Sequence, residues 1–88
     1  MQVEFDWWMR DALRQASEKK TIWRDRRTKR GVDKLLKLGL LVAVKQTRFN
    51  TIYAITDHGR QVVPQLPTAD QEWAATGTDV YRRFEVQL

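Results

Sequence analysis

Near the start of the chain, apolar residues recur with the spacing of an amphipathic helix. Counted from the first of them, they stand at i+3, i+4, i+7 and i+11: Phe5, Trp8, Met9, Ala12 and Ala16, with Leu13 at the margin. Positions spaced in this way share one face of a helix, so the pattern predicts a helix over residues 5–16. Trp7 falls on the opposite side of that helix. It is either exposed at an interface or covered by the C-terminal segment.

A second helical pattern covers residues 28–38. Thr28 is a residue type that commonly caps a helix, and Gly39 is one that commonly ends a helix in the left-handed conformation. The apolar contacts of this helix are Val32, Leu35, Leu36 and Leu38. The opposite arc is mostly basic and carries Lys29, Arg30, Asp33, Lys34 and Lys37. We expect Asp33 either to pair with Lys37 or to accept a hydrogen bond from a cytosine.

Two runs with β-strand composition follow this helix. Residues 40–45 and 51–55 are rich in β-branched and apolar side chains and flank a polar loop. This arrangement predicts a β-hairpin. Lys45 and Arg48 stand near its tip, where they can reach a phosphate or a minor groove, since narrow minor grooves attract arginine. Phe49, also in the loop, is expected to fold back onto the hairpin.

The segments on either side of the helix and hairpin are less regular. In residues 17–27, Thr21 either caps a short helix or lies in an extended connection. Trp23 in the same segment either anchors the core or stacks on a nucleic-acid base. After the hairpin, Thr56 is expected to cap a short helix that Pro64 ends.

The C-terminal part contains two further patterns. Thr68 and Gln71 have the spacing of a capping box, which predicts a short helix carrying Trp73 and Ala74. Alternation of apolar and polar residues predicts a strand over residues 80–88. Since a strand needs a neighbour, we expect this one to pair with the hairpin or with a strand of a partner chain.

Positive charge is concentrated in one part of the chain. The net charge is +5, and residues 18–37 hold nine lysines and arginines against three acidic residues. Clustering of this kind indicates either a nucleic-acid-binding surface or a solvated helix face. Because the basic block leads directly into the second helix and the hairpin, we favour DNA as the partner.

Composition narrows the classes of site. The chain has no cysteine and a single histidine, His58, so disulfides are excluded and we expect neither a metal site nor a cofactor. It has no glycine-rich phosphate loop, so we expect no catalytic residue and no enzyme activity. No apolar run approaches the roughly 20 residues that span a bilayer, and the first residues lack the layout of a signal peptide. We therefore expect a cytoplasmic protein without a membrane partner.

The second helix and the hairpin together match a known pattern. It comprises Val32, Leu35, Leu36, Leu38, Gly39, Leu40 and Leu41, then Arg48, then Tyr53, Ala54, Ile55, Thr56 and Gly59. This run resembles winged helix-turn-helix DNA-binding domains, particularly MarR-like and PadR-like transcription regulators, and in size the small regulators of phages or mobile elements. The resemblance implies an α+β fold with a three-helix core and a β-hairpin wing. It places a winged-helix domain at 1–66 and an extension for packing or dimerisation at 67–88.

The resemblance also implies a mode of binding. The recognition helix, residues 28–38, would enter the major groove, and the wing, residues 45–51, would contact the adjacent backbone or minor groove. The residues assigned to DNA are Arg24, Arg26, Arg27, Thr28, Lys29, Arg30, Asp33, Lys34, Lys37, Lys45, Gln46, Arg48 and Asn50. The implied function is that of a small transcriptional regulator on double-stranded DNA. It would act at the nucleoid or, for a phage protein, in the host cytoplasm.

Assembly and two other functions stay open at this point. A homodimer is expected to form through strand 80–88 or through Trp7. One alternative function is a winged-helix module that docks on another protein. The other is an RNA or single-strand binder in which Trp23 and Phe49 stack on bases.

Overall fold

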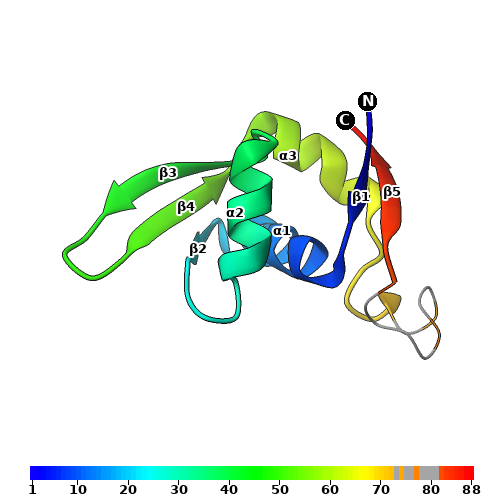
Figure 1. Cartoon of the computed structure of the whole chain (residues 1–88), viewed down its shortest axis with the longest axis horizontal. Coiled ribbons are helices and arrows are strands. Elements are labelled where there is room, and N and C mark those ends of the chain that lie inside the picture. Colours follow the sequence, from blue (N-terminus) through cyan, green and yellow to red (C-terminus); the bar gives the residue numbers. More distant parts are fainter. Residues whose placement is uncertain (73, 75–76, 78–81) are drawn as a thin grey trace.

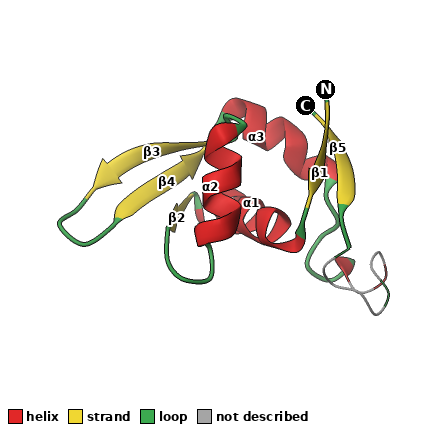
Figure 2. Cartoon of the chain, viewed as in Figure 1, coloured by secondary structure: helices red, strands yellow, loops and turns green. Residues whose placement is uncertain are grey.

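The computed structural model describes residues 1–72, 74, 77 and 82–88. Its helices are α1 (Trp7–Lys19), α2 (Lys29–Lys37) and α3 (Asp57–Val62), and a 3₁₀ turn, η1 (Val63–Gln65), continues α3. Its strands are β1 (Gln2–Phe5), β2 (Thr21–Trp23), β3 (Leu41–Gln46), β4 (Thr51–Ile55) and β5 (Phe84–Gln87). The α+β class expected from the sequence is confirmed (Figure 2).

The strands form two antiparallel sheets on opposite sides of the helices. One sheet has the order β2-β4-β3, and the other consists of β1 and β5. In Figure 1 the β3–β4 hairpin projects to one side of the helices and the β1–β5 pair lies on the other, with both termini at its end. The hairpin is confirmed, with its strands within a residue of the expected bounds.

Helix α1 begins two residues later than predicted. Phe5 pairs with Phe84 as the last residue of β1, and the Asp6 side chain caps the helix by accepting a hydrogen bond from the Met9 amide at 2.9 Å. The predicted start at residue 5 was therefore wrong, because the chain is extended up to its cap. Most of the predicted stripe is buried, namely Phe5, Met9, Ala12, Leu13 and Ala16.

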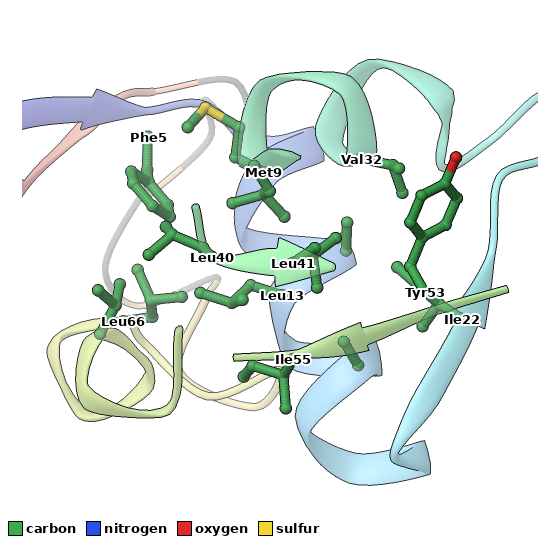
Figure 3. Close-up of a cluster of buried hydrophobic side chains, with 14 of the residues drawn as sticks. Phe5, Met9, Leu13, Ile22, Val32, Leu40, Leu41, Tyr53, Ile55 and Leu66 are labelled. Carbon is green, nitrogen blue, oxygen red and sulfur yellow. The ribbon is translucent and has the colours of Figure 1, made fainter. Parts of the chain in front are cut away.

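One core joins α1, α2 and the three-stranded sheet (Figure 3). The sheet contributes Ile22, Leu41, Tyr53 and Ile55, and α2 contributes Val32 and Leu35. Gly31 lets α2 approach α1, because a Cβ at this position would lie 2.2 Å from the Trp8 carbonyl oxygen. With this face turned inward, the opposite arc of α2 must face outward.

The turn after α2 is built as its sequence predicts. Gly39 has a φ of +73°, and its amide donates to the Leu36 carbonyl at 3.1 Å, while the Leu40 amide donates to the Leu35 carbonyl at 3.0 Å. These are the two hydrogen bonds of a Schellman C-cap. The Thr56 hydroxyl donates to the Gly39 carbonyl at 2.8 Å and accepts from the Gly59 amide at 3.0 Å. The predicted Thr56 cap is confirmed, and it ties the end of the hairpin to the end of α2.

The segment between α1 and α2 is extended and contains no second helix. Residues 17–28 are all described: α1 runs through Lys19, β2 pairs with β4, and a turn at residues 26–28 leads into α2. Ile22 points into the core, so its neighbour Trp23 points outward and is 49% exposed. Of the two roles expected for Trp23, the core anchor was wrong.

The C-terminal strand pairs with the N-terminal strand. Val86 lies opposite Val3 in the β1–β5 pair, and the Val86 side chain is fully buried. Within the chain the hairpin was therefore the wrong neighbour to expect, and pairing of this strand with a partner chain stays a prediction. The capping box is confirmed, since Thr68 and Gln71 exchange hydrogen bonds of 3.1 and 3.2 Å. Trp73 and residues 80–81, which also fall within these predictions, lie outside the described residues.

A buried ion pair fastens the C-terminal segment to α1. The guanidinium of Arg10, fully buried, donates to both oxygens of Glu72 at 2.8 and 3.1 Å and to the carbonyls of Phe5 and Arg82 at 3.0 and 2.8 Å. Arg14 also donates to Glu72. Burial raises the pKa of Glu72, but the hydrogen bonds from the two arginines outweigh it and hold the pKa below its ordinary value.

Candidate nucleic-acid interface

The outward arc of α2 carries most of the residues that the sequence assigns to DNA. Lys29, Arg30, Lys34 and Lys37 are exposed, and Asp33 is half-buried among them. This exposure follows from the burial of Gly31, Val32 and Leu35 on the other side of the helix. The structure thus brings the predicted helix residues together on one surface.

Asp33 pairs with Arg24, not with Lys37. The Nε and Nη2 atoms of Arg24 donate to the two carboxylate oxygens at 2.7 and 3.1 Å. The pKa of Asp33 lies below its ordinary value because of this hydrogen bond, with weaker help from the charges of Lys29 and Lys37. The expected Asp33–Lys37 pair was wrong because strand β2 delivers an arginine to the same carboxylate. In consequence, Arg24 is held against the basic face of α2.

Thr28 has an internal role. Although it occupies the N-cap position of α2, its side chain makes no capping hydrogen bond, and it is buried. Its hydroxyl donates to the Trp23 carbonyl at 2.6 Å and accepts from the Asp25 amide at 2.9 Å. A carboxylate oxygen of Asp25 accepts in turn from the amides of Thr28 and Arg27, both at 2.9 Å. The predicted capping bond was wrong, and Thr28 fixes the turn that starts α2 without reaching its exposed face.

The arginines of that turn lie at the edge of the surface. Arg26 and Arg27 are exposed. The guanidinium of Arg27 lies 3.4 Å from an Asp11 carboxylate oxygen and 5.8 Å from the ring centre of Trp7. Trp7 is half-buried and packs edge-on against Trp8. Arg27 therefore contacts Trp7. The sequence had suggested that Trp7 is exposed at an interface or covered by the C-terminal segment, and neither expectation included this contact.

The other flank of α2 faces the N-terminus of α1. Arg30 lies 5.0 Å above the ring of Trp8, and Lys34 pairs with Asp6. With Arg83, these four residues line a shallow cavity of about 370 Å³. Arg83 was not among the predicted site residues. No local pattern marks it, because only the β1–β5 pairing brings the C-terminal segment to this flank.

The hairpin tip is the second basic part of the surface. Lys45, Gln46 and Arg48 are exposed, and Asn50 is half-buried. Phe49 is 89% exposed, with the Arg48 guanidinium 5.7 Å from its ring centre. The expectation that Phe49 folds back onto the hairpin was wrong.

A cavity separates the hairpin tip from Arg24. It has a volume of about 400 Å³ and lies between the hairpin loop and Arg24, the residue that also binds Asp33. Its walls include Arg24, Thr47, Arg48, Phe49, Asn50 and Tyr53. The two groups of predicted residues therefore meet at Arg24. The sequence does not predict that Arg24 lies near the hairpin tip, because this proximity depends on the pairing of β2 with β4.

Two further kinds of feature were sought in the described part of the chain, a metal site and a membrane-spanning helix. Within it, no group of three or more histidine, cysteine, aspartate or glutamate residues is placed to hold a metal ion. None of the helices described there has the length and apolar character needed to cross a membrane. Searches against protein families, curated proteins and solved structures give no match to this chain.

Proposed function

We propose that the protein binds double-stranded DNA and acts as a small transcriptional regulator. The observation that supports this most is the basic outward face of α2 beside the basic hairpin tip, with Arg24 between them. A major groove admits an α-helix, and basic side chains on that helix and on a neighbouring hairpin can reach bases and phosphates together. Transcriptional regulation rests on the resemblance to winged helices.

In this proposal the residues of α2 divide by position. Lys29 and Arg30 lie in its first turn, the part of a recognition helix that meets base edges. Lys37, the last residue of α2, meets a phosphate. Lys34 is already paired with Asp6, so its charge is partly satisfied within the protein. Arg48 contacts the adjacent backbone or minor groove.

The proposed domain would be a winged helix without the usual helix before the recognition helix. The turn at residues 24–28 takes its place. Three internal contacts hold that turn: the Thr28 hydroxyl, the Asp25 carboxylate and the Arg24–Asp33 pair. A short turn of this kind can orient α2 because Gly31 already fixes the helix against α1.

The test is the salt dependence of binding to duplex DNA. With about five phosphate contacts per chain, the logarithm of the affinity should fall against the logarithm of the salt concentration with a slope near −4 to −5. Lys37→Gln should reduce that slope by about 1. The matched control is Lys19→Gln, which removes an exposed lysine from the end of α1. Titration of a labelled duplex by fluorescence anisotropy measures both. A slope near zero, or equal effects of the two substitutions, would contradict the proposal.

Docking on a protein is a second candidate, favoured by the outer face of the three-stranded sheet. Trp23, Val42 and Val44 are each about half exposed on β2 and β3. Exposed apolar groups gathered in this way are typical of protein interfaces. Salt-sensitive retention on heparin together with a duplex gel shift favours DNA. A saturable protein partner without either effect favours docking.

A further inference from the structure

The tip of the hairpin presents an aromatic ring to solvent. Phe49 is 89% exposed, more than any other large hydrophobic residue described. An exposed ring at a loop tip offers a flat apolar face that a second flat group can cover. Nucleobases stack on such rings, and the stacking tolerates any base because every base has a π-face.

The loop that carries this ring is internally braced. The Thr47 amide donates to the Asn50 carbonyl at 2.7 Å, and the Thr47 hydroxyl donates to the same carbonyl at 2.9 Å and accepts from the Asn50 amide at 3.0 Å. The Asn50 side chain accepts from the Thr51 amide at 2.9 Å. Because these bonds lie within the loop, they fix the backbone on either side of Phe49 without help from the body of the protein. A preorganised loop loses little backbone freedom on binding.

The space beside the ring suits the rest of a nucleotide. The cavity of about 400 Å³ that Phe49 helps to line falls within the range of about 300–1,000 Å³ typical of small-ligand sites. Arg48 and Arg24 bring guanidinium groups to its walls, and Arg24 is oriented by its two bonds to Asp33. Guanidinium groups bind phosphate oxygens through paired hydrogen bonds.

The polar groups of the cavity can meet the edge of a base. Asn50 lines it beside Phe49, and its side-chain amide can donate to a base acceptor while its oxygen holds Thr51. Tyr53 also lines the cavity, and its hydroxyl is a second neutral donor. This cavity, an open groove beside Phe49, therefore combines a stacking face, cations for a phosphate and neutral donors. A paired base inside a duplex cannot enter such a groove, whereas an unpaired base can.

We propose that this groove binds one unpaired nucleotide of a DNA strand, with the base stacked on Phe49 and its phosphate held by Arg24 and Arg48. The inference rests on the proposed function, since α2 would hold the flanking duplex. It adds a preference for DNA that is locally unpaired, where the unpairing cost is already met.

The test compares a short continuous duplex with the same duplex containing one unpaired adenine. The bulged duplex should bind more tightly to the wild-type protein. Phe49→Ala should weaken binding of the bulged duplex by about 5- to 150-fold, the range expected for loss of one stacked base, and leave the continuous duplex unchanged. The control is Val44→Ala, which shortens another exposed apolar side chain of the same hairpin. It should leave both affinities unchanged.

The two proposals fail in different ways. Equal affinity for both duplexes, or an equal effect of Phe49→Ala on both, would overturn the nucleotide site. If Lys37→Gln still lowers the salt slope, the proposed duplex function survives that result. If the continuous duplex does not bind, or binds with no effect of Lys37→Gln, while Phe49→Ala still weakens binding of the bulged duplex, the nucleotide site stands and the duplex function fails.

Discussion

Two arginines of this protein each hold a carboxylate through both of its oxygens, one inside the molecule and one on its surface. Arg10 binds Glu72 at 2.8 and 3.1 Å, and Arg24 binds Asp33 at 2.7 and 3.1 Å. The geometry of the two pairs is nearly the same. Their surroundings differ, because the side chain of Arg10 is fully buried whereas that of Arg24 is 37% exposed.

The surroundings decide what each pair does. Loss of the Glu72 carboxylate would take a negative charge away from a buried cation, so we expect this pair to stabilise the packing of the C-terminal segment on α1. Water and salt screen the Arg24–Asp33 pair, and exposed pairs add little to stability. The exposed pair can instead place Arg24 between the α2 face and the hairpin tip. The two pairs are alike in geometry but differ in role. The Arg10–Glu72 pair is a structural contact, and the Arg24–Asp33 pair is part of the proposed interface.

The largest effect is expected from Glu72→Gln. This substitution keeps the shape of the side chain but removes the carboxylate charge that faces the buried guanidinium of Arg10. We expect the free energy of unfolding to fall by about 3–5 kcal/mol, the usual cost of breaking a buried pair by removing one partner. Urea unfolding at neutral pH, followed by circular dichroism, measures the loss.

The matched control removes an exposed acid from the same segment. Glu85 lies on β5, in which only Val86 is buried, and Glu85→Gln should change stability by less than about 0.5 kcal/mol. A loss for Glu72→Gln that is no larger than the loss for this control would contradict a structural role for the buried pair.

How far the sequence predicts these features depends on how far apart the partners are. The α2 helix, its Gly39 ending, the Thr56 cap and the hairpin were predicted because each depends on residues a few positions apart. Glu72 lies 62 residues from Arg10, and no local period records such a contact. For the candidate site, the exposed row on α2 followed from helical spacing alone. The position of Arg24 did not, because it depends on the pairing of β2 with β4.

Lowering the pH is expected to have a smaller effect on stability. The pKa of Glu72 in the folded protein lies below its ordinary value of 4.5, so the folded state favours the ionised form. This contribution to stability is present above the ordinary pKa and is lost as the pH falls through the lower, folded value. Thermal unfolding measured while the pH is lowered should therefore show a steeper loss for the wild type than for Glu72→Gln. Parallel curves for the two proteins would show that Glu72 does not carry this dependence.

The smallest effect on stability, but a measurable one on binding, is expected from Asp33→Asn. The substitution removes the one acidic group from the outward arc of α2 and releases Arg24 from its ion pair. Binding of duplex DNA should tighten by about fivefold at low salt, and the salt slope should steepen by about 1, because the face that meets the phosphates loses a negative charge. Asp70→Asn, which removes an exposed acid from the C-terminal segment, is the control and should leave the slope unchanged. If Asp33 instead accepts a hydrogen bond from a cytosine, the same substitution will weaken binding and relax the base preference at one position. Selection of bound duplexes from a random library by both proteins separates these outcomes, since only the second changes the selected sequence.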